Sequence, residues 1–179
     1  AQQRLAFEEL LAQHLGLQLL RRQTRQHASW PLLKANALYQ KFSQSLSFAL
    51  TGAQQRVVDV LCDDLAAHQP MMRLVQGDVG CGKTVVAALA CTMAIDSGFQ
   101  AAVMAPTEIL AEQHFQTFKK WFEPLGITVV LLSGKLKGKK RELLQARITS
   151  GDAVITVGTH ALFQDDVVFN KLALVVIDE

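Results

Sequence analysis

Residues 74–84 read Leu-Val-Gln-Gly-Asp-Val-Gly-Cys-Gly-Lys-Thr and match the pattern G-x-x-x-x-G-K-[ST] at every fixed position. The glycines of such a pattern allow backbone conformations that turn successive N–H groups toward phosphate oxygens. In this arrangement the Lys83 ammonium meets the β- and γ-phosphates, and the Thr84 hydroxyl binds Mg²⁺. The sequence therefore predicts a phosphate-binding loop formed by Gly77, Asp78, Val79, Gly80, Cys81, Gly82, Lys83 and Thr84.

The segments on either side of the loop support this interpretation. Residues 72–75 form a short apolar run that predicts a buried strand, and residues 84–95 form an apolar segment of helix length. Because strand, loop and helix follow in this order, the N–H groups and the dipole at the helix N-terminus converge on an anion. The alternative is a glycine-rich turn that binds nothing, and the order of the elements argues against it.

Length and composition indicate one globular α/β domain with an appendage, since the chain has 179 residues, 50% of them hydrophobic and 19% charged. The longest apolar stretch, residues 85–95, is too short to span a bilayer, so we expect no membrane partner. Three widely spaced cysteines indicate a reducing cytosol and argue against a disulfide framework or a zinc site. The chain opens with Ala1 and lacks a signal-peptide pattern, so we expect it to be cut from a longer protein.

The rest of the chain alternates helical and strand patterns after two leading helices, expected at 5–22 and 32–46. Further helices are expected at 53–67, 84–97, 108–122 and 139–150, and strands at 72–75, 101–105, 127–132, 153–157 and 172–177. Thr51 is expected to cap a helix N-terminus, and Gly98, Gly126 and Gly151 to end helices. Apolar strands separated by helices predict an α/β fold with a parallel sheet covered on both faces.

An acidic pair, Asp178 and Glu179, follows the last predicted strand. The C-terminal edge of a parallel sheet is the edge at which the phosphate loop also lies, and ligands bind there in such folds. We therefore expect Asp178 to hold Mg²⁺, mostly through water, and Glu179 to polarise the attacking water. An acidic pair after a strand is a weak signal alone, and the preceding phosphate loop strengthens it.

These motifs resemble those of superfamily-two helicases. Residues 77–84 and 175–179 resemble motifs I and II, and residues 50–54 resemble the Q-motif region, in which a glutamine reads adenine. Residues 105–114 and 157–162 resemble motifs Ia and Ib, which are strand-to-helix turns that contact the DNA backbone. The resemblance implies a RecA-like motor domain that uses ATP and Mg²⁺. It also implies adenine recognition by Gln54 and DNA contacts by Pro106, Thr107, Gly158, Thr159 and His160.

Within that superfamily the motifs are similar to those of the bacterial RecG family, whose members are ATP-dependent helicases of branched DNA. The resemblance implies a helical linker at 1–46 after a wedge domain, and a first motor domain at 47–179. It further implies a cytoplasmic monomer that acts on branched, single-stranded or double-stranded DNA and contacts single-strand binding protein. Cys81 stands where the RecG loop usually has serine. Taken alone, the chain is expected to bind nucleotide but to hydrolyse it negligibly.

Several of these residues have a simpler interpretation. Gln54 could be an exposed polar residue, Phe48 is expected in the core rather than against adenine, and Thr107 and Thr159 could only cap helices. A transcription-repair coupling translocase shares much of the motif wording, and a nucleotide-gated binding module without turnover is the alternative from another class.

Five basic residues lie at positions 135–141 around two glycines. Such a run is usually a solvated surface. The RecG resemblance favours contact with the DNA backbone, without sequence readout, by Lys137, Lys139 and Lys140.

Overall fold

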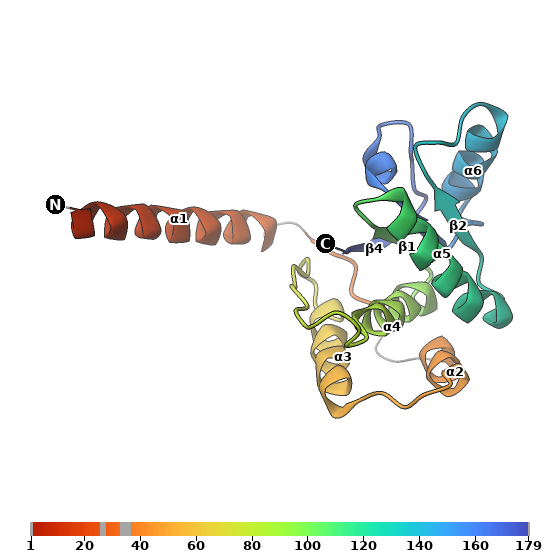
Figure 1. The fold of residues 1–179 in the computed structure, drawn as a ribbon, viewed down its shortest axis with the longest axis horizontal. Helices are drawn as coiled ribbons and strands as arrows, with labels where there is room; N and C mark the ends of the chain where they lie inside the picture. Colours follow the sequence, from red (N-terminus) through yellow and green to blue (C-terminus); the bar gives the residue numbers. More distant parts are fainter. Residues whose placement is uncertain (1, 26–27, 33–36, 179) are drawn as a thin grey trace.

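The computed structural model describes residues 2–25, 28–32 and 37–178, with the course of the chain shown in Figure 1. The helices are α1 (Gln2–Arg25), α2 (Ala37–Ser45), α3 (Gly52–Leu65), α4 (Lys83–Asp96), α5 (Glu108–Phe122), η1 (Glu123–Leu125), α6 (Lys139–Ser150) and η2 (His160–Phe163). The strands are β1 (Gln100–Met104), β2 (Val129–Leu132), β3 (Ile155–Gly158) and β4 (Leu172–Ile177). The bounds of α5, α6 and β4 match the expected ranges.

The four strands form one parallel sheet in the order β2-β3-β1-β4. Alternate residues of β1 enter two different cores, as the period of a strand requires. Ala101 and Val103 face the core built with α4 and α5, whereas Ala102 faces a second core that contains Ile148 of α6 and Leu162 of η2. The prediction of a parallel sheet covered on both faces is therefore confirmed.

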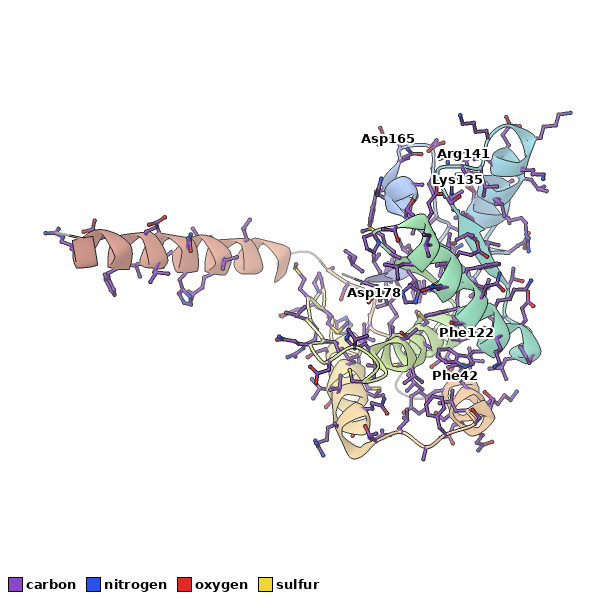
Figure 2. All side chains as sticks on the ribbon, in the orientation of Figure 1. Phe42, Phe122, Lys135, Arg141, Asp165 and Asp178 are labelled. Atoms are coloured by element: carbon purple, nitrogen blue, oxygen red, sulfur yellow. The ribbon has the colours of Figure 1, made fainter. Side chains whose placement is uncertain are left out.

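Helix α2 packs against the rest of the described fold through α4 and α5. Phe42 of α2 is fully buried, stacks on Phe122 with ring centroids 4.9 Å apart, and meets Trp121 edge to face at 5.9 Å (Figure 2). The Asp96 carboxylate, at the last residue of α4, accepts the backbone N–H groups of Leu38 and Tyr39 at 3.1 to 3.3 Å. Since a helix leaves its first N–H groups unpaired, Asp96 caps α2 from another helix.

The leading helix α1 projects away from this body and is the red element of Figure 1. Its apolar side chains at positions such as Phe7, Leu10 and Leu15 are at least half exposed. This helix was expected, and its amphipathic pattern fits a connector. Among the residues that the structure describes, no helix is both long enough and apolar enough to cross a membrane.

The expected buried strand at 72–75 is wrong, because this segment forms no strand. Met72 is 78% exposed and Leu74 is 87% exposed. The segment and β4 line one cavity of about 370 Å³, and the sheet of the described residues contains only β2, β3, β1 and β4. A strand forms only where its N–H and C=O groups pair with a neighbour, and apolar sequence alone does not supply one.

Local capping follows the sequence. Thr51 caps α3 in a capping box with Gln54, and Gly98, Gly126 and Gly151 adopt left-handed conformations with φ of 79°, 79° and 88°. The described part of α2 starts at Ala37, Leu32 is not helical, and residues 33–36 lie outside the described part. Phe48 is 47% exposed, so its expected place in the core is wrong.

Candidate functional site

The predicted phosphate loop leads from residues 72–76 into α4. Gly80 and Gly82 have φ of 81° and 83°, a left-handed region that glycine adopts most readily, and Gly82 is the residue before the first turn of α4. A Cβ on Gly77 would lie 2.6 Å from the Cys81 sulfur, so the loop closes tightly at this point. The Lys83 ammonium donates to the carbonyls of Gly77 and Asp78 at 2.7 and 3.1 Å.

Lys83 is thus folded back over the loop, and phosphate binding by the loop stays a prediction. The Lys83 ammonium donates to neutral carbonyl oxygens. A phosphate oxygen could take their place as acceptor and form a stronger, charge-assisted hydrogen bond. Asp78 and Val79 lie on the exposed outer side of the loop, with Val79 95% exposed.

Gln54 contacts the loop directly. Its side-chain amide donates to the carbonyl of Cys81 at 2.9 Å, and its amide oxygen accepts the backbone N–H of Thr51 at 2.8 Å. The side chain is thus held between the start of α3 and the loop. Gln54 therefore lies beside the loop, and its role toward adenine stays a prediction.

Asp178 follows β4 and reaches the same cavity as Lys83 and Thr84. Its backbone N–H donates to the carbonyl of Met104 at 2.9 Å, which continues the β1 and β4 ladder by one residue. The parallel topology thus brings the carboxylate to the phosphate loop across about a hundred residues of sequence. Glu179 lies outside the described residues. Within the described part of the chain, no cluster of three or more His, Cys, Asp or Glu side chains could hold a metal ion.

His114 joins this site, although sequence reasoning gave it no role. Its Nε2 lies 2.6 Å from Oδ2 of Asp178, and its side chain is 14% exposed. His114 stands on α5, which follows β1, and β1 pairs with β4. The sequence alone does not reveal that pairing. The pairing brings the side of α5 that carries His114 against the end of β4.

The residues expected to contact DNA differ in exposure. Pro106 and Thr107 are exposed at the start of α5, where Thr107 caps the helix by accepting the N–H of Leu110 at 3.3 Å. His160 is exposed, whereas Gly158 and Thr159 are buried. The Thr159 hydroxyl accepts the N–H of Ala161 at 3.5 Å, so it has the capping role that the simpler interpretation gave it.

The basic run divides into paired and exposed charges. Lys135 forms an ion pair with Glu108, and Arg141 binds Asp166 at 3.0 Å and Gln164 at 2.6 Å. Figure 2 shows Lys135 and Arg141 at the same end of the molecule. Hydrogen bonds from Gln145 and from Arg141 hold the pKa of the Asp166 carboxyl below its usual range.

The remaining cations of the run are Lys137, Lys139 and Lys140. All three are exposed, and no ion pair is found for them among the described residues. These are the three lysines that the sequence interpretation favoured for DNA contact.

Alkylation should distinguish the three cysteines. Cys81 is exposed on the loop, Cys62 is half-buried, and burial raises the pKa of Cys91 to about 12, which disfavours its reactive thiolate. We expect iodoacetamide to modify Cys81 first, and Mg-ATP to slow that reaction. Mass spectrometry of peptides over time measures the order, with Cys81→Ser as the control that should lose the fastest phase. Earlier modification of Cys62 or Cys91 would contradict it.

Comparison with known proteins gives consistent matches. The family model described as DEAD/DEAH box helicase matches residues 51–179. The whole chain is 56% identical to the ATP-dependent DNA helicase RecG of Haemophilus influenzae and 54% identical to that of Escherichia coli K12. It spans about a quarter of the length of these curated relatives, namely 26%. A solved structure of RecG bound to a three-way DNA junction superposes with a TM-score of 0.91 at 42% identity, covering 100% of this chain and 25% of that one. The expected resemblance to RecG is confirmed.

Proposed function

Since the chain belongs to the DEAD/DEAH box helicase family, we propose that it is part of an ATP-driven DNA motor that remodels branched DNA. The observation that carries this proposal is the convergence of Lys83, Thr84 and Asp178 on one cavity beside the phosphate loop. The match to RecG helicases over the full chain supports the choice of substrate class. It includes the leading helices, which favours the RecG type over a transcription-repair coupling translocase.

The residues at the cavity fit a nucleotide with its metal. Lys83 supplies a cation at the N-terminus of α4, where the helix dipole also favours phosphate. The Thr84 hydroxyl and the Asp178 carboxylate are oxygen ligands, which Mg²⁺ prefers. When bound, Mg-ATP supplies the phosphoanhydride whose hydrolysis drives the motor.

This chain's own groups then have separate tasks. The loop N–H groups and Lys83 bind and orient the phosphates, Thr84 and Asp178 hold the ion, and Glu179 orients the attacking water. Gln54, already in contact with the loop, recognises the adenine edge.

DNA lies, in this proposal, along the turns that precede α5 and η2. Pro106 and Thr107 offer an exposed helix N-terminus to a phosphate, and His160 is the exposed residue of the second turn. Gly158 and Thr159 shape that turn from the interior. The three exposed lysines Lys137, Lys139 and Lys140 add sequence-independent attraction to the backbone.

Removing these charges should weaken DNA binding without changing its sequence preference. We expect the triple change of Lys137, Lys139 and Lys140 to Gln to lower affinity for unrelated DNA sequences alike. Each lost phosphate contact should reduce the log–log salt slope by about 0.7 to 0.9. Fluorescence anisotropy at several salt concentrations measures the slope. Lys135→Gln is the matched control and should change the slope less, because Glu108 already pairs that charge. A slope unchanged by the triple substitution would mean that the basic run is a solvated surface that does not contact DNA.

The organisation of the intact protein is also part of the proposal. We place a helical linker at 1–46 and a first motor domain at 47–179 in a bacterial, cytoplasmic monomer that contacts single-strand binding protein. The packing of α2 on α4 attaches the linker to the motor domain.

The ATPase activity of the intact protein tests this proposal. The intact protein is one that contains this chain and is as long as the relatives. We expect phosphate release to rise several-fold when a three-way or four-way DNA junction is added, and less with linear duplex. A nucleotide-gated binding module would bind Mg-ATP and DNA with no such turnover.

A further inference from the structure

His114 and Asp178 form a partly buried pair at the nucleotide cavity. Nε2 of His114 lies 2.6 Å from Oδ2 of Asp178, and the two side chains are 14% and 34% exposed. A carboxylate can only accept, so Nε2 carries the proton and donates it. Within the described residues, Oδ1 of Asp178 has no hydrogen-bond partner. One oxygen of the carboxylate is therefore held, and the other remains open to a ligand.

The helix that carries His114 also carries the first DNA-facing turn. Helix α5 begins after Thr107, and His114 lies seven residues further, which is about 10 Å along the axis. Ala111, Phe118 and Phe122, which lie on the same side of the helix as His114, are buried in the core. Because that face is tightly packed, the turn at Thr107 and the ring of His114 belong to one rigid element.

We propose that His114 is a positioning residue that orients the Asp178 carboxylate and couples it to the DNA-facing turn of α5. The inference rests on the proposed function, since it takes Asp178 as a ligand of the nucleotide's metal. A phosphate bound at Thr107 fixes the position of α5. His114, about two turns further along α5, in turn fixes the Asp178 carboxylate. By linkage, nucleotide binding must then change DNA affinity by the same factor.

A purely structural pair is the alternative, and binding measurements separate the two. In the intact protein, His114→Leu removes the donor and keeps the bulk, whereas His114→Gln keeps an N–H at a similar reach. Mg²⁺ should strengthen the binding of fluorescent ADP, and we expect this gain in affinity to be about tenfold smaller in the Leu variant than in the wild type. Tenfold is the usual effect of one hydrogen bond to a charged group. The effect of ADP on junction affinity should fall by a similar factor, and the Gln variant should recover most of both.

A double-mutant cycle tests whether the effect passes through Asp178. In an Asp178→Asn background, His114→Leu should change Mg-ADP affinity less than twofold, because the oriented carboxylate is already gone. Gln116→Leu is the matched control, since Gln116 is exposed on the same helix and bonds only to Glu112 in the described contacts. It should leave both affinities unchanged.

The outcomes distinguish this inference from the proposed function. Unchanged Mg-ADP affinity and unchanged coupling in His114→Leu would overturn the positioning role, and so would a Gln variant as impaired as Leu while both remain folded by circular dichroism. Failure of the proposed function would instead appear as wild-type affinity for Mg-ADP in Asp178→Asn itself.

Discussion

Replacing Lys83 with alanine should abolish ATP hydrolysis by the intact protein. Lys83 is the cation of the phosphate loop, and its ammonium already lies against the loop carbonyls of Gly77 and Asp78. A donor aimed at charge that develops in the transition state is worth roughly a hundredfold to a thousandfold in rate. We therefore expect phosphate release to fall by at least about a hundredfold, with or without junction DNA.

The matched control is Lys120→Ala, since Lys120 is an exposed lysine on α5. It should hydrolyse ATP at the wild-type rate. Circular dichroism should show Lys83→Ala folded, because the lost bonds lie in the loop and not in the core. Wild-type turnover in Lys83→Ala would show that the site has been assigned to the wrong residues.

The Phe42→Ala substitution should destabilise the 179-residue chain by about 3 to 5 kcal/mol, the usual cost of removing a buried aromatic side chain. Phe42 is fully buried, stacks on Phe122 and meets the edge of Trp121, so alanine leaves a cavity and loses both ring contacts. Urea denaturation followed by circular dichroism measures the free energy of unfolding.

Phe163→Ala is the matched control for that measurement. Phe163 is 57% exposed, so the same substitution should cost less than about 1 kcal/mol. Equal losses in the two variants would mean that α2 is not packed on α4 and α5 as described.

Local sequence signals predicted the elements whose causes are local. The N-cap residue Thr107 and the apolar period of the following residues predicted α5 at its observed bounds. Gly151 in its left-handed conformation likewise ends α6 where expected. The phosphate loop follows from its own spacing, because backbone and side-chain contacts within a few residues build it.

The features that sequence reasoning missed depend on contacts between distant segments. Residues 72–75 read as a strand from their sequence, yet they pair with no strand among the described residues. His114 meets Asp178 only because β1 lies beside β4, and Lys135, in the turn before α6, meets Glu108 at the first residue of α5. Nothing in the residues near Phe42 indicates that α2 would pack so deeply, since its partners come eighty residues later.

The contact between Asp96 and α2 has a mechanical consequence. Helix α4 begins at Lys83, in the phosphate loop, and ends at Asp96, whose carboxylate grips the first turn of α2. These two points are the opposite ends of one rod about 20 Å long. A pulling force on α2 would therefore be transmitted along α4 to the loop at residues 77–82. Conversely, a movement of that loop along the axis of α4 would displace α2.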